Sequence, residues 1–422
     1  MTVLLPGAPA TTQATTQATA PAPTDVPRRS AATASAVLRA VLDHGPVARS
    51  TVGEVTGLSP AAVSRQLSTM TELGLVRDHR VPRLRSTVGR PHVPVDIDTG
   101  HQVIAGIHVA VPHATLVLMD LRGRVVAEER RRHAPGHTPG GLLAGLGDAM
   151  AHFLDRHAGG RRPLGVGFAT GGHVDPGRGT VVTHPQLGWH ELAVGAALED
   201  RLGLPVRVES HARALARAEQ LIGAHRERAR TSQVALFVGN VVDAAIATNG
   251  SVHQGPGAAA GDVRHLPVGS ETGCACGRAG CFEATVTEQA VAVRAVECGH
   301  LPVPRFADVL AALEAGAPWA ERLFAERARA VGRVAALLLD LINPEIVVVT
   351  ESGIARRPDL IGEVRAEVAR CSHVGADPAR AVVPGTFGPR ALAVAGGSVL
   401  LHDVYTDPGD LPARTSFPSS EN

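Results

Sequence analysis

The chain has 422 residues, 44% of them hydrophobic, and is long enough to bury the cores of two or three domains. No run approaches the roughly eighteen apolar residues that cross a bilayer, and the polar N-terminus lacks the pattern of a secretory signal, so we expect no membrane insertion. Three of the five cysteines lie within eight positions, which argues against a disulfide framework and favours a reducing cytoplasm. The net charge is only +1.

The chain begins and ends with polar, proline-containing segments. Residues 1–30 repeat TTQA and then become rich in proline, so they lack the apolar side chains that offset ordering entropy. We expect a disordered leader over 1–30 and a flexible tail over 406–422. Between these segments the sequence pattern predicts an N-terminal domain over 31–95 and a body over 96–405.

Charge is unevenly distributed between these two parts. Residues 28–95 contain ten arginines and four acidic residues, a local charge of +6, whereas residues 96–422 contain 31 arginines and 35 acidic residues, a charge of −4. A basic module attached to a near-neutral body suggests that the first domain meets a polyanion. This interpretation depends on a motif within the basic module.

The basic module has the pattern of a helix-turn-helix. A short helix would hold Val52 and Val55, and Gly57 would then supply a tight turn. Ser59 is a good N-cap for a second helix, and Pro60 suits its first position. The second helix would bury Val63, Leu67 and Met70 and would expose Ala61, Ala62, Ser64, Arg65, Gln66 and Ser68. Small residues at its start would let it approach a major groove closely.

A preceding helix and a following wing complete the predicted domain. The preceding helix would bury Val37, Leu38, Val41 and Leu42, and residues 74–97 have the pattern of a two-stranded wing. We therefore predict a winged helix-turn-helix domain that binds double-stranded DNA. Its predicted DNA contacts are Ser59, Ala61, Ser64, Arg65, Gln66, Arg83, Arg85 and Arg90. A small protein-interaction module with a solvated basic face is the alternative.

The body alternates short apolar segments with helical patterns, which predicts an α/β fold. The expected strands cover residues 103–111, 114–121, 164–170, 234–239 and 345–350. The expected helices cover residues 191–203, 212–224 and 330–343.

A histidine and three cysteines lie close together between residues 265 and 281. The spacing His265-x8-Cys274-x-Cys276-x4-Cys281 supplies one imidazole and three thiolates, a set suited to tetrahedral zinc. Four protein ligands leave no position for an exchangeable water, so we predict one structural zinc ion per chain and no catalytic metal. A disulfide and free buried thiols are the alternatives.

The order of motifs in the body resembles that of the ROK family, which groups sugar kinases with related repressors. The segments LGVGFATGGHVDPGRG, HPQLGW, VESHARALARAE and AGDVRHLPVGSETGCACGRAGCFEA match family motifs in the family's order. The resemblance covers residues from about 30 to 405, including the winged module that the repressor branch carries. It implies an actin-like (ribonuclease H-like) body of two α/β lobes, with a sugar site in the cleft between them.

By this resemblance, the positions at which the kinases hold ATP have changed. His108 replaces an aspartate, and Val111 and Pro112 stand in the first phosphate turn, where Pro112 has no N–H to offer. The second turn, GNVVD, keeps only Gly239 and adds the negative charge of Asp243. The adenosine-side glycines are replaced by Thr350, Glu351 and Ser352. We therefore expect no ATP binding.

His211 stands where the resemblance implies the aspartate that is the general base of the kinases. A histidine can accept a proton, but without a phosphoryl donor there is no transfer to assist. We expect a histidine near a helix start that hydrogen-bonds locally, in a body that is not an enzyme.

The resemblance also implies positions that would contact a sugar. They are Gln186, Glu209, Ser210, His211, Asp262, His265 and Glu283, of which Gln186, Ser210, His211 and Asp262 differ from the family's residue types. Arg264 places a bulky cation beside them, where the family has glycine. An altered small-molecule effector, an ordinary hexose and no effector at all stay open.

We interpret the chain as a cytoplasmic DNA-binding transcription regulator, a repressor of carbohydrate-related or wider metabolic genes. One recognition helix reads few base pairs, so we expect a homodimer or homotetramer on the operator. The alternatives are a sugar kinase with a DNA-binding head, and a ligand-independent regulator whose body docks a protein partner.

Overall fold

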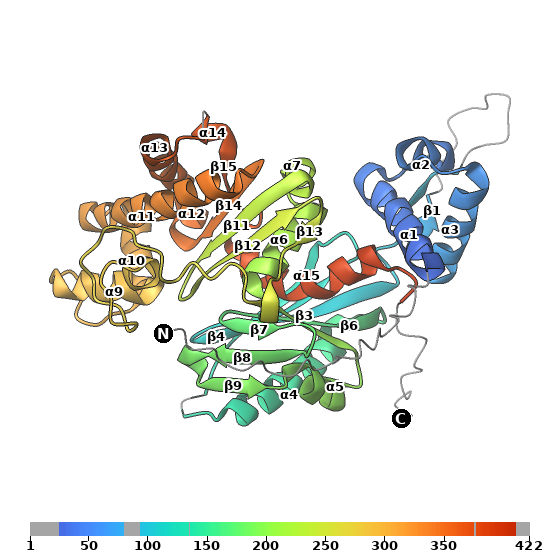
Figure 1. The fold of residues 1–422 in the computed structure, drawn as a ribbon. Coiled ribbons are helices and arrows are strands. Elements are labelled where there is room, and N and C mark those ends of the chain that lie inside the picture. The colour runs from blue at the N-terminus through green and yellow to red at the C-terminus, as the bar shows by residue number, and fades with distance from the viewer. Residues whose placement is uncertain (1–24, 80–92, 135, 375–376, 411–422) are drawn as a thin grey trace, which may run out of the picture.

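The computed structural model describes residues 25–79, 93–134, 136–374 and 377–410. A small helical domain at the N-terminus is followed by two α/β lobes (Figure 1), which confirms the expected fold class. In these described ranges, no helix has the length and apolar character needed to cross a membrane.

The N-terminal domain contains α1 (Asp25–His44), α2 (Arg49–Thr56), α3 (Pro60–Glu72), β1 (Val76–Asp78) and β2 (Val95–Ile97). Gly57, with a φ of 69°, ends α2 in the left-handed conformation. The side chain of Ser59 accepts the N–H of Ala62 and caps α3. The predicted turn, cap and buried stripe of α3 are therefore present.

The domain differs from its sequence pattern in one detail. Helix α1 begins at Asp25, six residues before the expected start at residue 31. Of the two valines of α2, Val52 is fully buried, whereas Val55 is 53% exposed. Helix α2 ends at Thr56, and its last turn lies outside the core.

The wing is described only at its base. Strands β1 and β2 pair antiparallel, with Val76 opposite Ile97. Strand β2 thus continues two residues past the expected domain boundary at residue 95. The predicted contacts Arg83, Arg85 and Arg90 lie outside the described residues.

The first lobe is built on a five-stranded sheet with the order β10-β6-β3-β4-β5. Its strands are β3 (Gln102–Val109), β4 (His113–Met119), β5 (Val125–Arg132), β6 (Arg162–Thr170) and β10 (Val206–Ser210). β3 pairs parallel with β6 and antiparallel with β4, and it is buried along its whole length. This burial explains its continuous apolar sequence.

A second, smaller sheet and two helices complete the first lobe. They are β7 (His173–Asp175), β8 (Thr180–His184), β9 (Trp189–Leu192), α4 (Pro139–His157) and α5 (Val194–Leu202). The expected helix over 191–203 therefore begins late, because Glu191 and Leu192 belong to β9.

The second lobe has a five-stranded sheet with the order β13-β12-β11-β14-β15. Its strands are β11 (Ser232–Val238), β12 (Val242–Thr248), β13 (Ser251–Val252), β14 (Ile346–Glu351) and β15 (Val382–Pro384). Its helices are α7 (Arg226–Thr231), α8 (Phe282–Val286), α9 (Glu288–Glu297), α10 (Phe306–Glu314), α11 (Pro318–Ile342), α12 (Ser352–Arg356), α13 (Ile361–Cys371) and α14 (Pro378–Ala381).

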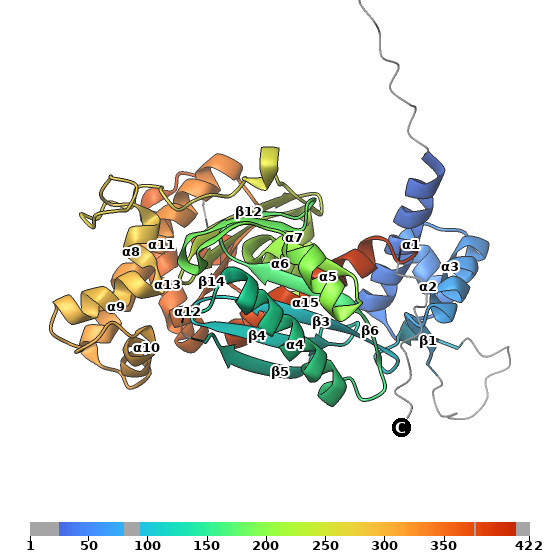
Figure 2. The same ribbon diagram turned by 90° about the horizontal axis from the view of Figure 1, so that it is seen from below.

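Two helices join the lobes, as the view from below shows (Figure 2). Helix α15 (Ala391–Thr406) packs on the sheet of the first lobe and on α6 (His211–Ile222), which in turn contacts β11 and β12 of the second lobe. A Cβ on Gly106 or Gly167 in the sheet would clash with the backbone at Gly396 and Gly397 of α15. Glycines at these positions therefore permit the close approach of helix and sheet.

Candidate functional site

The exposed face of α3 carries the predicted DNA contacts that lie in the described residues. Ala61, Ser64 and Arg65 are exposed, Gln66 is half-buried, and Ser59 is exposed at the helix start. Hydroxyl, guanidinium and amide groups on one helix face can donate to base edges and phosphates. The structure thus places these five predicted residues on one surface.

The cluster of His265, Cys274, Cys276 and Cys281 lies in the loop before α8. One ligand atom from each residue lies within 4.8 Å of the others. Nδ1 of His265 is 3.6 Å from Sγ of Cys274, and the Sγ atoms of Cys276 and Cys281 are also 3.6 Å apart. A tetrahedral zinc with Zn–S bonds of about 2.3 Å has sulfur–sulfur edges of about 3.8 Å. These four residues therefore fit a metal ion.

The same distances exclude a disulfide in this arrangement, because bonded sulfur atoms lie only about 2.05 Å apart. Cys276 and Cys281 are free cysteines. Backbone hydrogen bonds close the loop, from Cys274 N–H to the carbonyl of Arg278 and from Gly277 N–H to the carbonyl of Cys274. A hydrogen bond from Arg278 lowers the pKa of Cys276 to about 6, which favours the thiolate that a metal requires.

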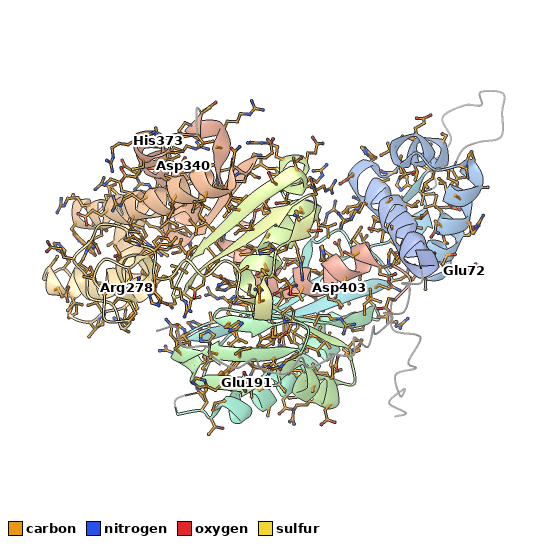
Figure 3. The ribbon with its side chains drawn as sticks, viewed as in Figure 1. Glu72, Glu191, Arg278, Asp340, His373 and Asp403 are labelled. Atoms are coloured by element: carbon orange, nitrogen blue, oxygen red, sulfur yellow. The ribbon has the colours of Figure 1, made fainter. Side chains whose placement is uncertain are left out.

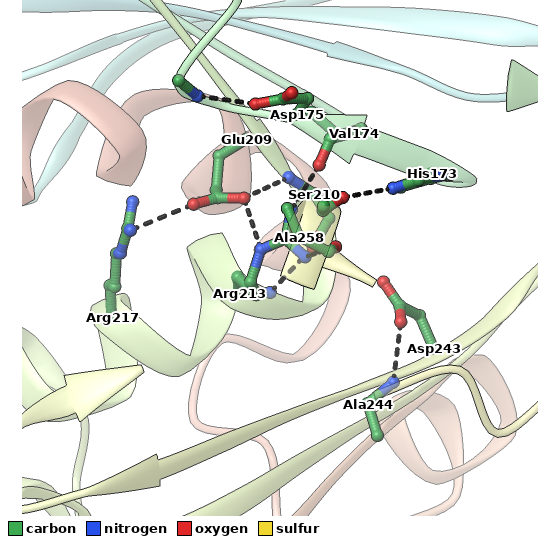
Figure 4. A network of polar contacts seen from close by, with 12 residues as sticks. His173, Val174, Asp175, Glu209, Ser210, Arg213, Arg217, Asp243, Ala244 and Ala258 are labelled. Carbon is green, nitrogen blue, oxygen red and sulfur yellow. Dashed lines mark hydrogen bonds and ion pairs between the residues drawn. The ribbon is translucent and has the colours of Figure 1, made fainter. Parts of the chain in front are cut away.

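Glu209, at the end of β10, is completely buried beside two arginines of α6 (Figure 4). Its Oε1 accepts hydrogen bonds from Nε of Arg213 at 2.5 Å and from the N–H of Ser210 at 2.8 Å. Its Oε2 pairs with Nη2 of Arg217 at 3.0 Å. The chain thus supplies partners to this carboxylate, although Oε2 has the ion pair with Arg217 and no hydrogen bond.

Arg213 extends this network to β7 and to the segment after β13. Its Nη1 donates to the carbonyl of Ala258 at 2.9 Å, and its Nη2 donates to the carbonyl of Val174 at 2.8 Å. Asp243 lies across from this group in Figure 4 and accepts the N–H of Ala244. Burial raises the pKa of Asp243 to about 7, and the charge of Arg213 opposes that rise.

His211 is the first residue of α6 and is buried between other rings. Its imidazole stacks on His108 with a centroid distance of 5.7 Å and lies 3.9 Å from the ring of Phe237 in β11. All four ring nitrogens of this histidine pair are buried without a hydrogen-bond partner. The expectation of a locally hydrogen-bonded His211 is therefore wrong, and the ring acts as a packing group.

Burial, together with the nearby charges of His184 and Arg130, lowers the pKa of His108 to about 3. Burial also lowers the pKa of His211 well below its usual value. Both rings are therefore neutral near pH 7.

Asn240, just after β11, connects the two lobes. Its Nδ2 donates to the carbonyl of Val111 at 2.8 Å, and Nε2 of Gln186 donates to the carbonyl of Asn240 at 2.7 Å. Val111 and Gln186 belong to the first lobe, whereas Asn240 belongs to the second. The predicted effector contact Gln186 thus holds the lobes together here.

Asp262 and Arg264 form a pair near the metal cluster. Nε and Nη2 of Arg264 donate to the two carboxylate oxygens of Asp262 at 2.9 and 2.6 Å. These hydrogen bonds lower the pKa of Asp262. Arg264 also lies within electrostatic reach of Glu283 and Asp243. Among the predicted effector contacts, Asp262 and Glu283 are thus brought together, with Arg264 between acidic groups.

Glu351 lies at the end of β14, where the family resemblance puts an adenosine-side glycine. Its carboxylate accepts the N–H groups of Gly353 at 2.9 Å and Ile354 at 2.6 Å, and it pairs with the buried Arg327. The protein's own carboxylate thus occupies the start of α12. A phosphate group approaching this point would meet a negative charge.

Sequence reasoning missed the roles of Arg213, Arg217, Asn240 and Phe237. The i,i+4 spacing of Glu209 and Arg213 is a signal that could have indicated their ion pair. No such local signal exists for Asn240 and Phe237, because their partners lie on the other lobe.

Comparisons with known proteins agree with this geometry. The ROK family model matches residues 104–402. Transcriptional regulator Rv0485 of Mycobacterium tuberculosis (strain ATCC 25618 / H37Rv) is 36% identical over 392 residues, 90% of this chain and 87% of that protein. The xylose repressor of Bacillus subtilis (strain 168) is 22% identical over 369 residues, 86% of this chain and 94% of the repressor.

A solved structure shares the fold over nearly the same extent. The crystal structure of a ROK family transcriptional regulator, a homolog of the E. coli MLC protein, gives a TM-score of 0.73 at 21% identity. The similarity covers 90% of this chain and 97% of that one. A two-lobed α/β body behind a winged helix-turn-helix domain defines the class of protein. The chain belongs to the ROK family, and it is one of that family's transcriptional regulators.

The buried histidines make the stability depend on pH. Unfolded histidine has a pKa of about 6.5, so below that pH the unfolded chain binds protons that folded His108 and His211 do not. The stability is therefore complete above about pH 6.5 and decreases as the pH falls toward 3. From about pH 7.5 to 5, urea titrations should show a lower free energy of unfolding, by up to about 1.4 kcal/mol per pH unit for each such histidine.

The double variant His108→Leu/His211→Leu should show a smaller pH slope than the parent. His190→Ala, at an exposed position in the same lobe, is the control and should keep the parental slope. An unchanged slope in the double variant would contradict the explanation.

Proposed function

We propose that the protein is a repressor that binds a double-stranded DNA operator through α3 and the wing. The single observation that carries the proposal is the exposed face of α3, where Ser59, Ala61, Ser64, Arg65 and Gln66 lie together above a buried apolar stripe. The names of the relatives support regulation of transcription, and the xylose repressor supports a role in carbohydrate metabolism. The regulated genes are carbohydrate-related or belong to wider metabolism.

Assembly and location follow from the same function. One recognition helix reads too few base pairs for useful selectivity, so the protein acts as a homodimer or homotetramer on paired half-sites. Its site of action is the cytoplasm, which agrees with the free thiols of the His/Cys cluster.

The body is a regulatory module and not an enzyme. Three buried side chains support this proposal. His108 and His211 stand at positions where the resemblance to the kinases implies acidic residues. Glu351 accepts the N–H groups at the start of α12. A sugar kinase with a DNA-binding head would need a phosphate site that these side chains obstruct. ATP is therefore not a cofactor of this protein.

A small molecule is the proposed effector, in the part of the cleft beside Asp262, Arg264, Glu283 and His265. These residues combine carboxylates with a guanidinium, whereas a hexose site is lined by hydrogen-bond acceptors alone. The difference favours a ligand other than an ordinary hexose. A body that docks a protein partner without a small molecule is the second candidate. Thermal shift against a panel of sugars and sugar phosphates separates the two.

The His/Cys cluster holds one structural zinc ion per chain. Three thiolates and one imidazole at tetrahedral spacing support zinc, and a set of four protein ligands supports a structural role. The metal would fix the position of the loop that carries His265, and this loop lies close to Glu283. The metal would have no catalytic role.

The recognition face can be tested by substitution. Arg65→Ala should weaken operator binding by about 1–3 kcal/mol if Arg65 contacts a base, with relaxed sequence preference at that position. The operator is first selected from genomic DNA, and binding is then measured by fluorescence anisotropy at fixed salt. Arg131→Ala removes an equal charge from an exposed position on β5 and should leave the affinity unchanged. Equal effects of the two substitutions would contradict the assignment.

The zinc assignment predicts a metal-dependent stability. Cys276→Ser should reduce bound zinc from about one ion per chain to almost none, and it should lower the melting temperature because a structural ligand is lost. Mass spectrometry of the metal and differential scanning calorimetry measure these effects. Cys298→Ser, at an exposed cysteine outside the cluster, should change neither quantity. Unchanged zinc content in Cys276→Ser would refute the predicted ligand set.

The loss of kinase chemistry predicts no nucleotide affinity. Isothermal titration with ATP and Mg²⁺ should show no binding, and a coupled assay with hexoses and amino sugars should show no turnover. ATP-dependent phosphorylation of any of these sugars would restore the kinase alternative.

A further inference from the structure

The N-terminal domain shares its hydrophobic core with the body. Buried side chains of α1, among them Val37 and Leu38, belong to one continuous apolar cluster with Met119 of β4 and with Leu401 and Tyr405 of α15. A shared core attaches the domain firmly to the first lobe.

Hydrogen bonds at the edge of this core also connect the N-terminal domain to the first lobe. Oγ of Ser35 donates to the carbonyl of Tyr405 at 2.6 Å, and the hydroxyl of Tyr405 donates to the carbonyl of Leu121 at 2.7 Å. Nε2 of Gln102 donates to the carbonyl of Leu73 at 2.6 Å. These contacts fix α1 and the end of α3 relative to β3 and α15.

Asp43, in the last turn of α1, forms ion pairs with two arginines of α7. Nη1 and Nη2 of Arg230 reach its two carboxylate oxygens at 2.6 and 3.1 Å, and Nε of Arg226 reaches Oδ1 at 3.1 Å. The Asp43 side chain is only 15% exposed, so solvent screens these charges less than at an open surface. Arg39, one turn earlier on α1, has a pKa lowered by burial and by the charge of Arg230.

Helix α7 continues directly into the second lobe. It ends at Thr231, and β11 begins at the next residue, Ser232. At the other end of β11, Phe237 packs on His211, and Asn240 makes the hydrogen bonds between the lobes. A strand of seven residues spans about 23 Å. Because β11 pairs with β12 on one side and β14 on the other, it is a rigid connection between the cleft and α7.

We propose that Asp43 is the positioning residue through which the second lobe sets the orientation of the DNA-binding domain. The first lobe holds the domain by the shared core, whereas Arg226 and Arg230 hold Asp43 from the second lobe. A change in the contacts of Asn240 then moves β11 and α7 and displaces α1 through Asp43. The proposal rests on the proposed function, because its readout is the affinity for operator DNA.

A double-mutant cycle tests the connection. Asn240→Ala removes an interlobe hydrogen bond, and Asp43→Asn removes the charge on α1 with little change in shape. The operator fragment selected with the parental protein is the probe. Asn240→Ala should change the operator Kd by about fivefold or more in the parental background and by less than about twofold in the Asp43→Asn background.

Two further variants separate positioning from stability. Arg226→Gln/Arg230→Gln removes the same ion pairs from the side of α7 and should reproduce the loss of coupling. Arg228→Ala changes a residue of α7 that pairs with Glu345 and should leave the effect of Asn240→Ala intact. Melting temperatures are measured for every variant, since a purely structural role of Asp43 would lower stability without changing the response to Asn240→Ala.

The outcomes distinguish this proposal from the proposed function. If the parental protein selects no DNA, the proposed function fails. If it binds an operator and Asn240→Ala has the same effect with and without the Asp43 charge, the positioning role is overturned. An unchanged Kd for Asn240→Ala in the parental background would also overturn it, because the cleft would then have no connection to the DNA-binding domain.

Discussion

The packing of α15 is the constraint on which the other parts of the structure depend. This helix lies against the sheet of the first lobe, against α6 and against α1 of the N-terminal domain. Its close approach to β3 and β6 requires glycine at positions 106 and 167, where a Cβ would meet the backbone of α15 at Gly396 and Gly397. Since α6 carries His211 and Glu209 is the residue that precedes its N-cap, the position of α15 also fixes these two residues. Because α1 also packs against α15, the N-terminal domain is held against the body.

Side chains of the chain itself pack against one another where β3, α6 and β11 meet. Aromatic and neutral histidine rings pack together at the centre, and buried carboxylates are satisfied by arginines and backbone N–H groups of the chain. The four ring nitrogens of His108 and His211 have no hydrogen-bond partner among the described residues.

The His/Cys cluster and α3 lie at opposite ends of the molecule. Figure 3 shows Arg278, in the loop of the cluster, far from Glu72 at the end of α3. The backbone hydrogen bonds of the loop place the start of α8 and hence Glu283.

Local sequence was sufficient for features that depend on neighbours in the chain. The cap of α3 at Ser59, the turn at Gly57, the spacing of the four metal ligands and the buried strand β3 all follow from short-range patterns. The exposure of Val55 and the late start of α5 did not, because they depend on which neighbouring element covers each residue.

By itself, therefore, the sequence determined the fold class, the family, the grouping of His265 with the three cysteines and the exposed face of α3. Only the tertiary structure decided that Glu209 pairs with Arg213, that His211 packs against Phe237, and that Asp43 forms ion pairs with the arginines of α7. Asp43 and Arg230 are 187 positions apart, and no periodicity or spacing along the chain encodes such a pair. Their contact arises because the packing of the domain and both lobes brings α1 beside α7.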